Sequence, residues 1–181
     1  EEDLEMLLIQ DELKFQRNRL DLIIEGTNAG AWEWNIHTGK TVFNEKWAEM
    51  LGYTLEELSP TTIETWQEII HPEDLEKALK LAEKHFAGEI DEYNTEIRMQ
   101  HKDGRWIWMN DRGKVISWDE KNKPLKMVGI HLDITENKMR EKELRSLAEA
   151  MTNISDSVIL TDDQFRIQYI NKAAERLFGY S

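Results

Sequence analysis

The sequence predicts an α+β domain whose sheet is flanked by amphipathic helices at both ends. Two observations support this prediction. Apolar residues recur with helical spacing in residues 1–25 and 137–152, and segments that alternate apolar and polar residues lie on both sides of a group of short capped helices. The 181 residues suffice for one such domain and part of another. A chain of this length needs no disulfide or metal to fold.

The composition excludes several classes of function. Asp and Glu number 36 and Lys and Arg 23, so the formal charge is −13. This argues against nucleic acid or an anionic membrane surface as partner, because both require a basic footprint. The sequence has no cysteine, which removes disulfides, zinc thiolates and thiol nucleophiles. We expect no metal site, no direct membrane contact and a cytoplasmic location, whether or not the parent protein is anchored in a membrane.

Residues 1–25 are predicted to form a helix that ends at Gly26. Apolar residues recur there at alternating steps of three and four, the spacing of a coiled-coil seam with one polar step at Gln16: Met6, Ile9, Leu13, Leu20 and Ile23. Periodicity leaves two interpretations open. The helix is either an amphipathic cap on its own domain or a signalling and dimerisation helix whose contacts include Leu13, Leu20 and Ile23.

The central domain, residues 26–136, begins with two predicted strands. Residues 30–36 alternate apolar and polar side chains, and a turn with Gly39 leads to a short strand at 41–43. Three later strands are joined by a turn with the Asp103-Gly104 hairpin signal and by a turn at Pro124: 93–100, 105–117 and 125–132.

Short helices are predicted between the two groups of strands. Asn44 caps the first one. The next two begin at capping boxes, in which a Thr and a Glu three residues later bond each other's backbone: Thr54 with Glu57, and Thr61 with Glu64. A longer helix begins at His71-Pro72, because proline suits the unpaired N–H groups of a helix start, and ends at Gly88.

A linker helix is predicted over residues 137–152. Asp133 and Glu136 have the spacing of a capping box at its start. Apolar residues then recur with heptad spacing, Leu144 and Leu147 among them.

Sliding the chain by 127 residues aligns two segments without a gap. Residues 44–53 match 171–180, and both begin with Asn and end with Gly-Tyr. We interpret residues 153–181 as the truncated start of a second domain in a longer protein. A remnant of this size falls below the roughly 40 residues with which a chain usually buries its own core. Its strands must therefore borrow a partner or stay loose.

The order of elements and six short motifs resemble the PAS domain family, in the PAS/PAC form of bacterial and archaeal sensor histidine kinases and diguanylate cyclases. The motifs are Gly30-Ala-Trp-Glu-Trp-Asn35, Asn44…Leu51-Gly52-Tyr53, His71-Pro72-Glu73-Asp74, Lys102-Asp103-Gly104, Trp108…Asp111-Arg112-Gly113 and Gly129…Asp133-Ile134-Thr135-Glu136. The resemblance implies a five-stranded antiparallel sheet, with short helices over one face, that cups a pocket. Flanking helices would carry the state of the pocket to an effector.

The two faces of each strand are separated by the alternation of side chains. Resemblance to flavin-binding relatives places one face toward the pocket: Trp32, Trp34, Ile97, Met99, Ile107, Met109, Met127 and His131. Two Trp side chains leave little room for a flavin or haem, so we favour a filled core or a pocket for an unknown small ligand. The opposite face carries Trp106 and Trp108, which we expect a helix or a partner chain to cover.

Two histidines are candidates for chemistry. His131 can bond a ligand when neutral or sense pH when charged; the alternative is a core histidine paired with a neighbour such as Asp111. His85 lies near the position where haem-binding relatives place an axial ligand, but a lone His on a helix flank is more often surface or core. We therefore expect no cofactor. The adduct chemistry of photosensory relatives needs a thiol, which this chain lacks.

The favoured interpretation is a non-enzymatic sensor module. A ligand or partner shifts the pocket, and Asp133, Ile134, Thr135 and Glu136 re-aim the helix that follows. We expect a homodimer, with further helix and sheet contacts at Trp106, Trp108, Leu144 and Leu147, and a kinase or cyclase domain of the same chain downstream. Three alternatives stay open: a ligand-free dimerisation spacer, a haem- or flavin-binding redox or gas sensor, and a small-molecule enzyme with Asp111 and His131 as acid–base pair.

Overall fold

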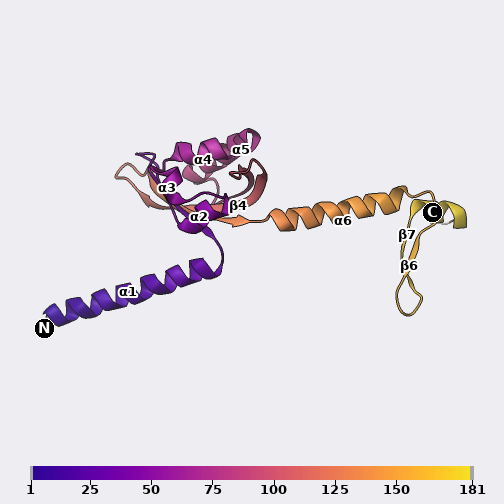
Figure 1. Cartoon of the computed structure of the whole chain (residues 1–181), viewed down its shortest axis with the longest axis horizontal. Helices are drawn as coiled ribbons and strands as arrows, with labels where there is room; N and C mark the ends of the chain where they lie inside the picture. Colours follow the sequence, from indigo (N-terminus) through magenta and orange to yellow (C-terminus); the bar gives the residue numbers. More distant parts are fainter. Residues whose placement is uncertain (1, 180–181) are drawn as a thin grey trace. The chain divides into compact units, whose positions relative to one another are not determined.

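The computed structural model describes residues 2–179 and divides the chain into two compact units, Glu1–Thr135 and Glu136–Ser181 (Figure 1). Glu1, in the predicted N-terminal helix, and Tyr180 and Ser181, at the end of the repeated segment, lie outside the described residues. Within residues 2–179, no helix combines the length and the apolar character needed to cross a bilayer.

The first helix, α1 (Glu2–Gly26), is exposed along most of its length. Its seam residues are each more than half exposed: Met6, Ile9, Leu13, Leu20 and Ile23. An amphipathic cap would bury this stripe against its own unit. The exposure therefore disfavours that interpretation and leaves the apolar face of α1 available to another chain.

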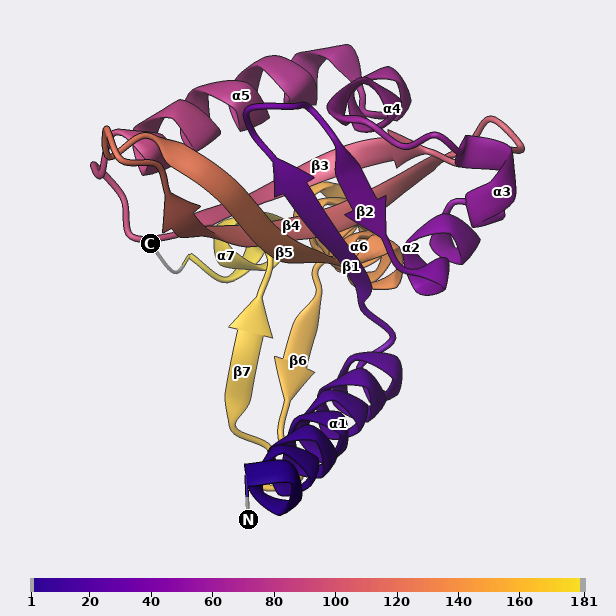
Figure 2. The ribbon, with the colours of Figure 1, turned by 90° about the vertical axis from the view of Figure 1, so that its left-hand side faces the viewer.

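Five strands of the described chain form one antiparallel sheet, as the sequence predicts (Figure 2). Their order is β2-β1-β5-β4-β3, and each pair of neighbours is antiparallel. The bounds are β1 (Gly30–Asn35), β2 (Thr41–Phe43), β3 (Tyr93–Gln100), β4 (Trp106–Trp118) and β5 (Pro124–Asp133). The last strand thus lies at the centre of the sheet, between the first strand and the hairpin of β3 and β4.

Helices α4 and α5 cover one face of this sheet (Figure 2). The bounds of the helices between the strands are α2 (Glu45–Met50), α3 (Leu55–Leu58), α4 (Ile63–Ile69) and α5 (Pro72–Phe86). The buried face of α5 carries Ala78 and Ala82, whose small side chains let the helix approach the sheet closely. Large core side chains fill the remaining space, including Trp47, Leu51 and Met99.

The two predicted capping boxes have different outcomes. Thr54 and Glu57 form the reciprocal box at the start of α3, as predicted. The prediction of Thr61 with Glu64 is wrong by one residue, because Thr62 and Thr65 form the box at the start of α4. The Thr61 hydroxyl instead donates to the carbonyl oxygen of Thr41 at 2.8 Å, which ties α4 to β2.

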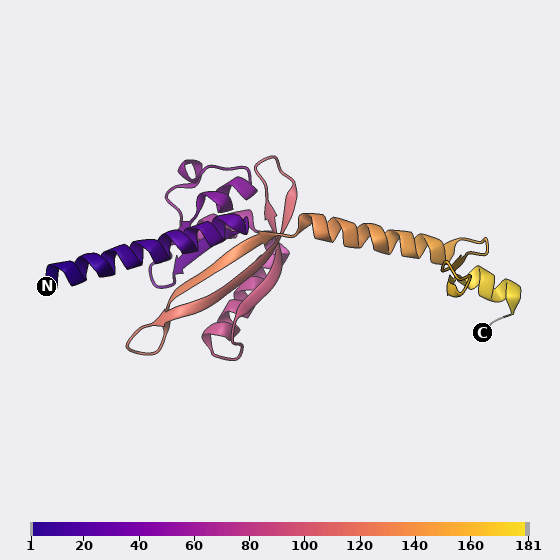
Figure 3. The same ribbon diagram turned by 90° about the horizontal axis from the view of Figure 1, so that it is seen from below.

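The second unit repeats the opening of the first. Helix α6 (Thr135–Asn153) runs into it from β5, a passage that Figure 3 shows as one continuous orange segment. Strands β6 (Ile159–Thr161) and β7 (Ile167–Ile170) follow, and then α7 (Lys172–Phe178). The two strands pair with each other in an antiparallel hairpin. Within the described residues, the second unit therefore supplies its own strand pairing, whereas the sequence predicted that its strands would borrow a partner or stay loose.

Candidate functional site

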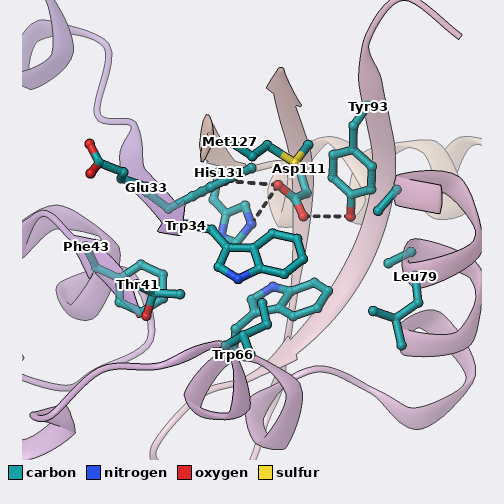
Figure 4. A pocket seen from close by; sticks show the side chains of 14 residues that line it. Glu33, Trp34, Thr41, Phe43, Trp66, Leu79, Tyr93, Asp111, Met127 and His131 are labelled. Atoms are coloured by element: carbon teal, nitrogen blue, oxygen red, sulfur yellow. Dashed lines mark hydrogen bonds and ion pairs between the residues drawn. The ribbon is translucent and has the colours of Figure 1, made fainter. Parts of the chain in front are cut away.

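A cavity of about 50 Å³ lies between the inner face of the sheet and helices α4 and α5 (Figure 4). Most of its lining is apolar or aromatic: Trp32, Trp34, Phe43, Ile63, Trp66, Ala78, Leu79, Ala82, Tyr93 and Met127. The remaining lining residues are Glu33, Thr41, Asp111 and His131. One water needs about 10–15 Å³ of such space. The cavity therefore holds a few waters or one small molecule.

A network of buried polar side chains belongs to the wall of this cavity. His131 Nδ1 accepts a hydrogen bond from Trp47 Nε1 at 2.7 Å, and His131 Nε2 lies 2.9 Å from Asp111 Oδ1. The Asp111 carboxylate also accepts from Trp32 Nε1 at 3.1 Å and from the Tyr93 hydroxyl at 2.9 Å. Side chains from α2, β1, β3 and β5 thus connect to one buried carboxylate on β4.

Trp47 determines the protonation of His131. An indole N–H can only donate, so His131 Nδ1 must carry the lone pair, and the neutral ring holds its proton on Nε2, toward Asp111. The Nε2 contact with Asp111 is close but not well aligned for a hydrogen bond. A proton on Nδ1 would place two donors 2.7 Å apart. The ring is therefore a neutral core histidine whose Nδ1 is already bonded to Trp47, which disfavours a free catalytic base.

Asp111 is 2% exposed and acts as the common acceptor of this network. Burial and the neighbouring Asp111 carboxylate raise the pKa of the Tyr93 phenol far above its usual value, so Tyr93 remains a donor at every physiological pH. Within the described chain, no Lys or Arg lines the cavity. The charge of Asp111 is therefore stabilised by hydrogen-bond donors rather than by a cationic side chain.

Two glycines on neighbouring strands leave room for the Trp32 indole. Gly113 on β4 and Gly129 on β5 are partners across the sheet. A Cβ atom at either position would lie 2.4 or 2.3 Å from the Trp32 indole. Any side chain there would displace the ring. The indole thus covers the sheet at these two glycines.

Half of the predicted pocket residues line the cavity. Trp32, Trp34, Met127 and His131 do so. The others are buried in the core but lie outside the lining: Ile97, Met99, Ile107 and Met109. The sequence prediction missed Phe43 on β2 and Trp66 on α4. Strand alternation gives the face of a residue but not the element that folds over it, so no signal in the sequence marked these two.

The residues present do not fit haem or flavin. Both His85 nitrogens have partners: Nε2 accepts from the Val115 backbone N–H at 3.0 Å, and Nδ1 lies 3.0 Å from the Ile90 carbonyl oxygen. His85 is also not among the cavity-lining residues, so it acts as a structural tie between α5 and β4. A cavity of about 50 Å³ is far below the roughly 300–1,000 Å³ of sites for larger ligands.

The predicted relay residues form a joint between β5 and α6. The Asp133 carboxylate accepts from the Thr135 backbone N–H at 2.8 Å, two residues on rather than the three of a capping box. The Ile134 N–H donates to the Trp108 carbonyl oxygen, and the Thr135 hydroxyl accepts from the Trp108 N–H at 3.0 Å. Glu136 instead bonds Arg140 within α6. The joint is therefore fixed to β4 rather than capped within the helix.

The predicted dimer contacts differ in exposure. On α6, Leu144 and Leu147 are more than half exposed. Trp106 is 40% exposed and packs edge-on against His71. Trp108 is half-buried, with the Arg98 guanidinium 5.5 Å from its ring centre. The two indoles are thus partly covered by side chains of their own unit.

Comparison with protein family models identifies the family of this domain. Residues 40–131, just over half of the chain, match the model of the PAS fold, and residues 144–181 match a second PAS domain model. The chain belongs to the PAS domain family. This PAS domain is followed by the start of another, which the 127-residue repeat indicates from the sequence alone.

The curated relatives of this PAS domain are sensor proteins. The chain is 28% identical over 165 residues to the sensor protein FixL of Bradyrhizobium diazoefficiens, covering 87% of this chain and 31% of FixL. It is likewise 28% identical over 168 residues to a blue-light-activated histidine kinase of Brucella ovis, covering 90% of this chain and 33% of the kinase. The chain thus spans about a third of the length of these relatives.

Solved structures show the same fold. A sensory box histidine kinase/response regulator from Burkholderia thailandensis is 30% identical, with a TM-score of 0.65, over 75% of this chain and 99% of that one. The N-terminal domain of a diguanylate cyclase with a PAS/PAC sensor from Marinobacter aquaeolei is 23% identical, with a TM-score of 0.53, over 61% of this chain and 98% of that one. This PAS domain is therefore a sensor module related to those of histidine kinases.

Proposed function

We propose that this PAS domain binds a small ligand or partner group in its cup and relays binding through β5 and α6 to an effector domain. The observation that carries the proposal is the position of β5. This strand presents Met127 and His131 to the cavity and ends, two residues later, in the joint at Asp133. A change in the cavity wall reaches the start of α6 along a single strand.

The joint is weak enough to be switched. It is held by the Asp133 bond to the Thr135 N–H and by two bonds to the Trp108 backbone, each worth about 1 kcal/mol. A ligand shifts the joint only to the extent that it binds the two states with different affinity. A difference of about 3 kcal/mol would change the ratio of the two states more than a hundredfold.

The effector we infer is a histidine kinase or diguanylate cyclase domain of the same chain. The names of the relatives support this class. Such an effector uses a nucleoside triphosphate, so we place the module in the cytoplasm. The residues described here would then supply the input and not the catalytic step.

A homodimer is the second part of the proposal. The seam of α1, with Leu13, Leu20 and Ile23 more than half exposed, fits a second copy of itself as a coiled coil. If the cup takes no ligand, the same seam supports the second candidate function, a spacer that sets the register of neighbouring domains. Sedimentation of the 181-residue chain and of a Leu13→Asp/Leu20→Asp variant distinguishes a dimer formed by α1 from a monomer.

The joint is tested in the parent protein that carries this chain. Asp133→Ala removes an acceptor worth about 1 kcal/mol, and we expect it to change the ratio of effector activity with and without signal. Asp133→Asn keeps the acceptor and serves as the matched control. Normal signalling by Asp133→Ala would show that the joint does not carry the signal.

A further inference from the structure

The charge and the rings around the cavity point to one class of ligand. Building on the sensor function proposed above, we infer that the cavity takes a small organic cation, an ammonium compound that also carries a hydroxyl or carbonyl oxygen. The inference rests on three features of the lining: a buried carboxylate, aromatic walls and, besides His131 Nε2 next to Asp111, two polar atoms without a partner.

The electrostatics of the lining favour a positive ligand. Asp111 is 2% exposed, and its neighbours in the network are neutral: Trp32, Tyr93 and His131. Among the described lining residues, the other carboxylate is Glu33. It pairs with Lys126 at 2.7 Å and points away from the indoles in Figure 4. A bound cation would supply the buried charge partner that Asp111 lacks.

The walls suit an ammonium group rather than a metal ion. Aromatic side chains line the space, among them Trp34, Trp66 and Tyr93. Figure 4 draws the Trp34 and Trp66 indoles below Asp111 and the Tyr93 ring to one side. The negative face of an aromatic ring attracts a methylated ammonium, and such attraction is stronger in a desolvated site. The carboxylate and the rings would act on the same positive charge.

Two unpartnered atoms indicate an oxygen on the ligand. In the described chain, neither Trp34 Nε1 nor Thr41 Oγ1 has a hydrogen-bond partner, although both atoms are buried. Thr41 is 4% exposed, and both residues line the cavity. Leaving such groups unpaired is unfavourable. A ligand hydroxyl or carbonyl oxygen can accept from the indole N–H and bond the Thr41 hydroxyl at the end away from Asp111.

The test uses three probes of similar size on the 181-residue chain. Choline carries both the charge and the oxygen, tetramethylammonium carries the charge alone, and 3,3-dimethylbutan-1-ol is the uncharged carbon isostere of choline. Binding is measured by calorimetry and by the shift in Tm. We expect choline to bind at least tenfold more tightly than the isostere and to raise Tm at saturating concentration.

Two variants assign the two ends of the ligand. Asp111→Asn should remove the preference for choline over its uncharged isostere. Thr41→Val keeps the shape and removes an unpartnered oxygen, so the fold should be at least as stable. It should weaken choline severalfold and leave tetramethylammonium unchanged. Thr41→Val keeps the test informative if Asp111→Asn fails to fold.

The possible outcomes separate this inference from the sensor function. Equal binding of choline and its isostere would overturn the cation class while showing that the cup binds small molecules. Absence of binding by all three probes at millimolar concentration would also overturn it. The sensor function is judged independently by Asp133→Ala in the parent protein, which requires no knowledge of the ligand.

Discussion

The two PAS copies in this chain use one asparagine in the same way. Asn44 Oδ1 accepts from the Ala31 and Trp47 backbone N–H groups, and its Nδ2 donates to the Ala29 carbonyl oxygen. Asn171 Oδ1 accepts from Val158 and Ala174, and its Nδ2 donates to Asp156. Every partner in the second set lies 127 residues after its equivalent in the first.

The copies differ in what surrounds this asparagine. Leu51 in the first copy is fully buried, whereas its equivalent Phe178 is 55% exposed. Trp32 packs against Gly113 and Gly129, whereas its equivalent Ile159 is 42% exposed. The second copy has no β3 to β5 among its described residues. Local hydrogen bonds therefore form without the complete sheet, but burial of the apolar side chains requires it.

The largest expected difference between the copies is at Leu51 and Phe178. Leu51→Ala should reduce the unfolding free energy of the first unit by about 3 kcal/mol, because it leaves a cavity in the core. Phe178→Ala should cost less than about 0.5 kcal/mol, since the ring is exposed. All seven Trp residues lie in the first unit. Denaturation followed by Trp fluorescence therefore measures the unfolding of that unit, and hydrogen exchange of the amides in the second unit measures the stability of the second. Ile116→Ala, at an exposed site, is the control. A large effect of Phe178→Ala on exchange would mean that the second copy has a core of its own.

The asparagines should show the next largest difference. Asn44→Ala leaves buried backbone groups without partners and should cost about 2 kcal/mol in the first unit. Asn171→Ala should instead raise the exchange rates of residues 158–178, with the unfolding of the first unit unchanged. Asn94→Ala, at an exposed position, controls for loss of an amide. Equal effects of both substitutions on the fluorescence transition would contradict independent units.

The two copies also differ at Trp47, because its equivalent, Ala174, has no side-chain hydrogen-bond donor. Trp47→Phe keeps a ring next to Phe43 but removes the donor to His131, and we expect a loss of about 1–2 kcal/mol. His131 Nδ1 then loses its donor, and the ¹⁵N shifts of the two ring nitrogens should differ from those of the original protein. Trp118→Phe, at an exposed site, is the control. Unchanged ¹⁵N shifts of the His131 ring would show that Trp47 does not determine its tautomer.

The smallest expected difference between the two copies is in the turns at Asn35 and Asp162, which occupy equivalent positions in the repeat. Hydrogen bonds from the Arg166 backbone and side chain hold the pKa of Asp162 below its usual value. Because the folded pKa is the lower one, the stabilisation is complete above about pH 4. It is lost as the pH falls through the folded pKa. NMR shifts of residues 159–170 should show the hairpin loosening in acid, and Asp162→Asn should abolish that dependence. The turn at Asn35 has no such carboxylate and should not respond in this range.

Much of the fold could be predicted because its signals are local. The Asn44 cap, the Thr54 box and the strand alternation each depend on residues close in sequence, and the repeat is visible from direct comparison of two segments. The predicted capping box of Thr61 and Glu64 does not form, because the Thr61 hydroxyl bonds the backbone of Thr41, twenty residues away. The same limit applies to the site. Alternation placed Ile97 and Trp34 on one face, but only the packing of α4 and α5 decides that Trp34 lines the cavity and Ile97 does not.

By itself, the sequence determined the class of fold, the two copies of the PAS opening and the lack of thiol chemistry, because composition and short spacings are sufficient for each. The tertiary structure alone decided the state of the site. Trp47 imposes a neutral His131 from 84 residues away, and Gly113 and Gly129 leave room for the Trp32 ring. Both His85 nitrogens are occupied by backbone groups, one at Ile90 and one at Val115 of β4. Apart from the one at Ile90, these are contacts between residues far apart in the chain, and no local pattern encodes which donor meets which acceptor.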